Sequence, residues 1–123
     1  MSKSLKYLFI IHAVVAFIFG IALLVAPGRT LGFFGWAPID PLLSRLLGAA
    51  LLALSWSSYR GWQASSYEQV RTLVELETIF TVLGCVGLLR HLLIAWYPWY
   101  VWFLFAVLLV FAIAWAYHLW KKA

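Results

Sequence analysis

Long apolar runs, separated by short polar or proline-containing segments, make up most of this chain. A bilayer hydrocarbon core about 30 Å thick is crossed by a helix of ~20 apolar residues. Four runs are long enough for this, at residues 5–26, 41–59, 70–94 and 99–119. The pattern therefore predicts an all-α fold, a bundle of four transmembrane helices.

The residues at the ends of the runs match the chemistry of helix ends. Pro27 cannot continue the first helix and Gly28 permits a tight exit. Asp40 is a suitable N-cap for the second helix, with Pro41 in its first position. The fourth helix begins directly after Pro98. We therefore expect helix boundaries at these positions.

The three predicted connections differ in character. Residues 28–40 are short and apolar, so we expect this loop to lie in the membrane interface. Residues 60–69 form the one hydrophilic loop. Residues 95–98 are so few that the third and fourth helices must form an antiparallel hairpin. No connection is long enough for an extramembrane domain.

The composition supports the membrane prediction. Hydrophobic residues make up 66% of the 123 residues and charged residues 11%, against about 45–50% and about 25% in soluble domains. So small a chain cannot bury this much apolar surface internally. Residues 1–123 are therefore predicted to form a single integral membrane domain, which excludes a soluble enzyme and a nucleic-acid partner. One cysteine, Cys85, excludes a disulfide framework.

The basic residues predict an orientation. Cytoplasmic ends of transmembrane helices are enriched in Lys and Arg. Six of these residues lie at one set of span ends and three at the other. The six are Lys3, Lys6, Arg60, Arg71, Lys121 and Lys122, and the three are Arg29, Arg45 and Arg90. Both termini are therefore expected in the cytoplasm. All Trp and Tyr residues, Trp115 among them, lie near span ends, as an aromatic belt requires.

Small residues mark the expected packing faces, because membrane helices associate through close contact at such residues. In the first helix the face carries Ala16 and Gly20 in line with His12. In the second helix we expect Ala49, Ala53 and Ser57, beside Gly48, to form it. In the third it includes Thr78, Thr81, Gly84 and Cys85.

Three ionisable residues within the spans form a candidate intramembrane polar site. His12 lies about 10 Å into the first span, and Glu75 and Glu77 lie at similar depth in the third. Ionisable groups in membrane helices are costly and often functional. Glu75 can pair with Arg71 one turn away and reach the headgroups.

Glu77 points toward the small polar face, where burial requires a cationic partner or retention of its proton. His12 is the expected partner, and Ser55, Ser58 and Arg60 are further candidates. A purely structural His–Glu hydrogen bond that sets helix register is the alternative.

Arg45 lies four residues into the second helix among leucines. We expect it to reach outward, to pair with Asp40, or to bond the carbonyls freed where Pro27 ends the first helix. The expected role of both Arg45 and Asp40 is structural, tying the outer loop to the bundle.

Two segments resemble the small, uncharacterised four-helix membrane proteins common in bacteria. One is GIALLVAPG, residues 20–28, which ends the first helix, and the other is SRLLGAALL, residues 44–52, which opens the second. The resemblance implies the fold and a bacterial inner-membrane location. It implies no activity.

The function hypotheses come from different classes. No enzyme motif of the C-x-x-C, H-E-x-x-H or G-x-S-x-G type is present. We therefore expect a non-enzymatic accessory or assembly subunit of a larger membrane complex, with other membrane subunits or a homo-oligomer as partners. The alternative is a small proton-coupled transporter, or a protein that binds a hydrophobic ligand (lipid, quinone or pigment), using His12 and Glu77. A haem-, quinone- or pigment-bearing subunit is a third possibility, although no cofactor or metal site is predicted.

Overall fold

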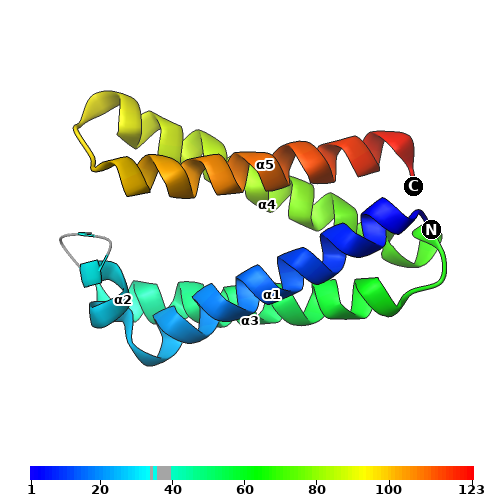
Figure 1. Cartoon of the computed structure of the whole chain (residues 1–123), viewed down its shortest axis with the longest axis horizontal. Helices are drawn as coiled ribbons and strands as arrows, with labels where there is room; N and C mark the ends of the chain where they lie inside the picture. The colour runs from blue at the N-terminus through cyan, green and yellow to red at the C-terminus, as the bar shows by residue number, and fades with distance from the viewer. Residues whose placement is uncertain (34, 36–39) are drawn as a thin grey trace. The chain divides into compact units, whose positions relative to one another are not determined.

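The computed structural model describes residues 1–33, 35 and 40–123, and all regular secondary structure in this part of the chain is helical (Figure 1). This confirms the predicted all-α class. The five helices are α1 (Lys3–Val25), α2 (Pro27–Phe33), α3 (Pro41–Gln63), α4 (Tyr67–Ile94) and α5 (Trp99–Lys121).

Four of these helices are long and apolar enough to cross a membrane: α1, α3, α4 and α5. They contain 23, 23, 28 and 23 residues. At 1.5 Å per residue, even the shorter ones extend about 34 Å, slightly more than a bilayer core. Each of the four predicted spans therefore corresponds to one long helix of the structure.

The hydrophilic loop predicted at 60–69 is mostly helical. Helix α3 continues to Gln63 and α4 begins at Tyr67, so only residues 64–66 connect them. The prediction was wrong at both edges because hydropathy marks the apolar part of a helix and not its end. Residues 60–63 and 67–69 belong to α3 and α4 although charged and amide side chains interrupt the apolar run there.

The apolar loop predicted after the first helix is also partly helical. Helix α1 ends at Val25, and Pro27 opens α2 with its fixed backbone angle in the first position. The Ala26 carbonyl accepts the Thr30 N–H at 3.0 Å, and the Thr30 hydroxyl donates to the Ala22 carbonyl at 3.1 Å. Proline therefore ends one helix and begins the next. Phe34 and residues 36–39 of the predicted loop lie outside the described residues.

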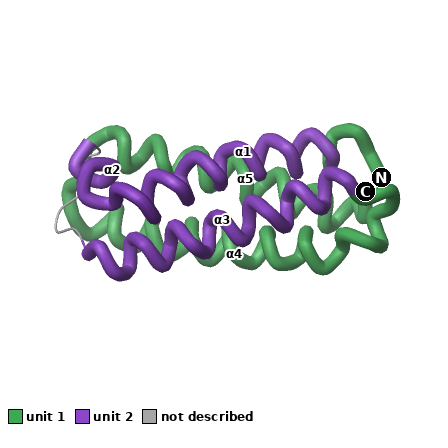
Figure 2. Tube along the Cα trace, turned by 90° about the horizontal axis from the view of Figure 1, so that it is seen from below, with its two compact units in different colours: residues 1–5, 64–123 green, residues 6–63 purple. Residues whose placement is uncertain are grey.

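The chain forms two compact units (Figure 2). Unit 1 contains residues 1–5 and 64–123, and therefore α4 and α5. Unit 2 contains residues 6–63, and therefore nearly all of α1 together with α2 and α3.

In unit 2, two glycines bring α1 and α3 into backbone contact. A Cβ added to Gly48 would lie 2.6 Å from the Leu24 nitrogen and 2.8 Å from the Gly20 carbonyl oxygen. A Cβ added to Gly20 would lie 2.9 Å from Leu52 Cγ. A third glycine, Gly61, lies against the Phe9 ring. A Cβ added to Gly61 would lie 2.5 Å from Cε1 of that ring. These contacts join the two helices in antiparallel register.

The buried face of α1 is the predicted one, but that of α3 is not. His12, Ala16, Gly20 and Leu23 are all buried. On α3 the buried residues are Gly48, Ser55, Ser58 and Gly61, whereas Ala49 and Ala53 are exposed. The prediction for α3 was wrong because a small side chain permits a helix contact without requiring one, whereas the hydroxyls of Ser55 and Ser58 need hydrogen-bond partners, which α1 supplies.

In unit 1, α4 and α5 pack along each other as the predicted antiparallel hairpin, joined by residues 95–98. Gly84 faces α5 closely, since a Cβ there would lie 2.9 Å from Leu108 Cδ2. The Trp115 side chain, on the same hairpin, is fully buried. Other aromatic residues near helix ends are exposed, for example Trp96 and Trp120.

Candidate functional site

A buried polar contact joins α1 to α3 within unit 2. His12 is 5% exposed and Ser58 is fully buried. His12 Nδ1 lies 2.8 Å from the Ser58 hydroxyl oxygen, and either group can donate the hydrogen bond, depending on the imidazole tautomer. The sequence predicted a buried His12, and the structure identifies Ser58 as one of its neighbours.

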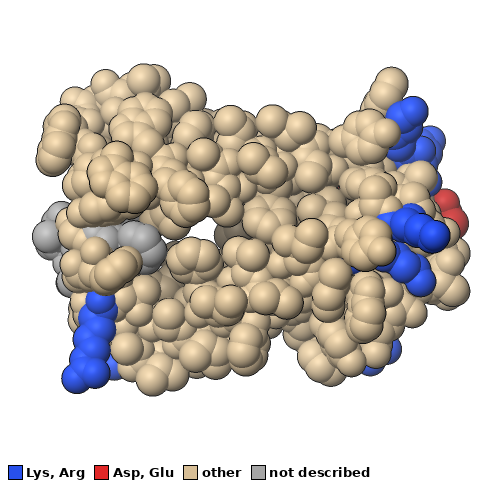
Figure 3. Space-filling view, viewed as in Figure 1, with Lys and Arg blue, Asp and Glu red and all other residues tan. Residues whose placement is uncertain are grey.

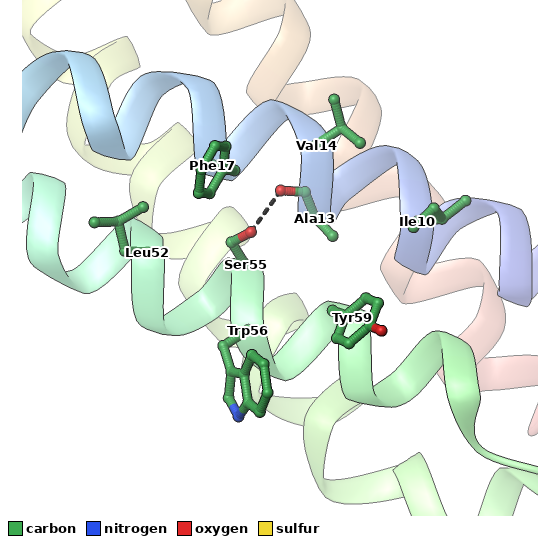
Figure 4. Close-up of a pocket in the computed structure, with 8 residues that line it drawn as sticks. All are labelled: Ile10, Ala13, Val14, Phe17, Leu52, Ser55, Trp56 and Tyr59. Carbon is green, nitrogen blue, oxygen red and sulfur yellow. Dashed lines mark hydrogen bonds between the residues drawn. The ribbon is translucent and has the colours of Figure 1, made fainter.

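A second hydrogen bond lies one turn away. The Ser55 hydroxyl donates to the Ala13 carbonyl oxygen at 2.6 Å, and Ser55 is 7% exposed (Figure 4). Because Ser55 and Ser58 are three residues apart, they lie on the same face of α3. Consecutive residues of α1, His12 and Ala13, therefore meet consecutive turns of α3. This double contact sets the register between the two helices.

Glu77 lies in unit 1 and is fully buried, as predicted. It belongs to a row of buried residues on α4 with Val74 and Thr81. The Thr81 hydroxyl donates to the backbone carbonyl of Glu77 at 2.7 Å. His12 belongs to unit 2, so the proposed pairing of His12 with Glu77 stays a prediction.

Glu75 has a different environment, also as predicted. Its Oε1 accepts a hydrogen bond from Arg71 Nε at 3.1 Å, one helical turn away. Both side chains are substantially exposed, at 43% for Glu75 and 58% for Arg71. Such an exposed ion pair contributes little to stability. Glu75 and Glu77 are only two residues apart, but they lie on nearly opposite sides of α4. Glu75 is therefore exposed, whereas Glu77 is buried.

Asp40 caps α3. Its Oδ1 accepts hydrogen bonds from the backbone N–H groups of Leu42 at 3.0 Å and Leu43 at 3.2 Å. Pro41, which has no N–H group, occupies the first position of the helix. This arrangement is the predicted N-cap. Arg45 is exposed on the first turns of the same helix, and no ion pair joins it to Asp40 among the described residues. The structural role of Arg45 stays a prediction.

The remaining histidines do not assemble a metal centre in the described part of the chain, where no group of three His, Cys, Asp or Glu side chains has the required proximity. His91 is exposed. His118 is buried, and its Nδ1 contacts the backbone oxygen of Ala123.

An open groove of about 490 Å³ lies between α1 and α3. Its volume falls in the range typical of small-molecule sites. Four residues of each helix form it, and their side chains are almost all apolar or aromatic (Figure 4). They are Ile10, Ala13, Val14 and Phe17 from α1, and Leu52, Ser55, Trp56 and Tyr59 from α3.

Comparisons with protein families, curated proteins and solved structures find no match to this chain.

The groove and the Ser55 contact are the features that sequence reasoning missed. The sequence pattern suggests Ser55 and Ser58 only as partners of Glu77, whereas in the structure both hydroxyls contact α1. A signal was present in their spacing of three residues and in their depth, which matches that of His12 in an antiparallel pair. The groove had no such signal, because it depends on the distance between two helices.

Proposed function

We propose that this chain is an integral protein of a bacterial inner membrane, crossing it four times with both termini in the cytoplasm. The observation that carries the proposal is the apolar surface along the long helices. In unit 2, Figure 3 shows an uncharged surface between Lys and Arg residues near the ends of the α1–α3 pair. Exposed side chains along this stretch include Ile18 and Leu46, each 59% exposed. Lipid is the solvent that suits such a surface.

The orientation follows from the same positive-inside bias that the sequence carries. In unit 1, Lys121 and Arg71 lie at the end of the hairpin that is proposed to be cytoplasmic, and Arg90 lies near the other end. Reporter fusions at both termini and within residues 95–98 test this. We expect alkaline phosphatase to be active only at 95–98, and green fluorescent protein to fluoresce only at the termini. The reverse pattern contradicts the proposed orientation.

Within that membrane, the chain acts as a non-enzymatic accessory or assembly subunit. Supporting this, the connections 64–66 and 95–98 leave almost no mass outside the membrane, while large side chains near helix ends are widely exposed. Trp96, Trp99 and Trp120 are 87%, 75% and 78% exposed. Aromatic side chains of this kind are enriched at protein interfaces.

The subunit role is tested by purification from native expression in mild detergent, followed by native electrophoresis and mass measurement. We expect a fixed stoichiometry with at least one other membrane protein, and loss of that partner on Trp96→Ala or Trp99→Ala. Trp62→Ala, at an aromatic residue that is 39% exposed, serves as the control. Recovery of the chain alone in one small oligomer contradicts the role.

The second candidate function is proton-coupled transport, favoured by the burial of two ionisable residues, His12 and Glu77, in helices able to span a membrane. Glu77→Gln and His12→Ala should then abolish proton-dependent flux in proteoliposomes, while expression and helical content stay normal. Glu75→Gln is the matched control and should retain the flux. If the first two variants only misassemble, both residues are structural.

A further inference from the structure

One end of the α1–α3 groove continues into polar residues. Lys6 precedes Ile10 by one turn and so extends the α1 face that also carries Phe17. On α3, Gln63 follows Tyr59 by one turn, and its Nε2 donates to the Tyr59 hydroxyl at 3.1 Å. Because α1 and α3 are antiparallel, Lys6 and Gln63 lie at the same end of the groove.

The other end of the groove is wholly apolar. It is formed by Phe17 and Leu52, and the outer rim includes Val14 and Trp56. Phe17, Val14 and Trp56 are 54%, 52% and 62% exposed, so the groove opens outward. The residues of α3 that line the groove, from Leu52 to Tyr59, advance about 10 Å along the helix axis, and Gln63 lies about 6 Å further on. The apolar lining is therefore about two thirds as long as one leaflet of a ~30 Å hydrocarbon core, and the polar end extends it to about one leaflet.

We propose that this groove binds an acyl chain of an anionic phospholipid, with the phosphate at Lys6. The apolar part of the groove matches an acyl chain in chemistry, and it can hold the headgroup-proximal part of that chain. At its polar end a lysine ammonium attracts phosphate as a point charge, and its aliphatic stem can lie along the groove. The Tyr59 hydroxyl and the Gln63 amide offer further polar contacts to a headgroup. The inference rests on the proposed membrane location and is independent of the subunit role.

Charge selects among lipids that share the same acyl chains. A net anionic headgroup is attracted by Lys6, whereas a zwitterionic headgroup brings its own cation to the same place. One lysine near an anionic surface favours binding by about fivefold. We therefore expect phosphatidylglycerol to be preferred over phosphatidylcholine by that factor.

Native mass spectrometry of the full chain in mild detergent measures this preference, with the two lipids added separately at equal concentration and with identical acyl chains. Lys6→Gln should reduce the preference, with Lys3 and Arg60 retained at the same end, and Lys6→Arg should keep it. Arg45→Gln is the matched control, because it removes a cation near the opposite end of the α1–α3 pair, and it should keep the preference. Equal occupancy by the two lipids in the unaltered protein overturns the proposal, as does an undiminished preference in Lys6→Gln.

The groove itself is tested by filling it. Val14→Trp places a large side chain in the groove and should strongly reduce occupancy by both lipids. Ile18→Trp, at a residue of similar exposure that does not line the groove, should leave occupancy unchanged. Circular dichroism of each variant establishes that the helices have formed. Unchanged lipid binding in Val14→Trp overturns the proposal. It is also overturned if the unaltered protein forms a dimer without lipid and Val14→Trp dissociates that dimer, because a second copy of the chain would then occupy the groove.

Two further measurements separate the sources of failure. Binding of free glycerol phosphate, without an acyl chain, would indicate a simple anion site and overturn the lipid proposal. Release of the chain from membranes by alkaline carbonate would contradict the membrane location itself. A carbonate-resistant protein without lipid preference contradicts the lipid proposal alone.

Discussion

The Gly48 Cα hydrogen faces the backbone of the Gly20 turn so closely that a Cβ on Gly48 would lie 2.8 Å from the Gly20 carbonyl oxygen. The atoms in the way are backbone atoms, including the Leu24 nitrogen at 2.6 Å, and they cannot move without displacing α1. Small residues that permit such backbone contact are the main means by which membrane helices associate. This contact therefore sets the separation of α1 and α3.

Gly48→Ala should consequently destabilise the protein. Overpacking typically costs about 1–3 kcal/mol, which would appear as a lower midpoint in thermal or SDS-induced unfolding followed by circular dichroism. Gly87→Ala is the matched control, because nothing lies within 4 Å of a Cβ at Gly87. It should be neutral, or stabilising by up to about 1 kcal/mol through helix propensity. Equal effects of the two substitutions would show that the Gly48 contact does not form.

Gly61→Ala should also destabilise, but in a way that a second substitution relieves. The atoms nearest to a Gly61 Cβ belong to the Phe9 ring, at 2.5–2.8 Å. Phe9→Leu shortens that side chain, so the double variant should recover part of the stability lost in Gly61→Ala. Unfolding midpoints of the two single variants and the double variant form the cycle. Strict additivity would argue against the contact, because contacting residues couple by about 0.5–3 kcal/mol.

Ser58→Ala should weaken the α1–α3 contact by removing the hydroxyl 2.8 Å from His12 Nδ1. Hydrogen bonds between membrane helices average about 0.6 kcal/mol, with a maximum of about 1.7 kcal/mol. We expect a loss in this range in unfolding experiments. Ser57→Ala is the control, since the Ser57 hydroxyl donates within its own helix to the Leu54 carbonyl. A loss in Ser57→Ala as large as that in Ser58→Ala would refute an interhelical role for Ser58.

Asp40→Ala should destabilise the start of α3 by about 0.5–2 kcal/mol, because it leaves the N–H groups of Leu42 and Leu43 without their acceptor. Asp40→Asn keeps an acceptor oxygen and should retain most of the stability. Hydrogen exchange at the first turn of α3 reports the change locally. If Asn is as damaging as Ala, the negative charge matters more than the cap.

Arg45→Ala should lower thermal stability in detergent more than Arg45→Lys does. A guanidinium is a planar group that can bond several acceptors, whereas an ammonium is a point charge. Since Arg45 is exposed, we expect the loss to be below about 1 kcal/mol. If Arg45→Ala is fully stable while a measured activity disappears, Arg45 belongs to a functional site.

Glu75 and Glu77 illustrate what helical periodicity can predict. Their 200° separation around α4 was enough to predict an exposed Arg71–Glu75 pair and a buried Glu77, and both are observed. Helical periodicity cannot predict the partner of a buried side chain, because that partner depends on which helix lies opposite. For His12 that partner includes Ser58, 46 residues away in the chain.

By itself, the sequence determined the helical class, the four long apolar helices, the cap at Asp40 and the hairpin of α4 and α5. These depend on local periodicity, on proline and on the length of a connection, all of which act within a few turns. Only the tertiary structure decided that Ser55, Ser58 and Gly48, rather than Ala49 and Ala53, face α1. In helices that are apolar on nearly every side, the hydrophobic pattern does not distinguish the buried face from the exposed one, so backbone proximity and hydrogen-bond partners across helices make that choice.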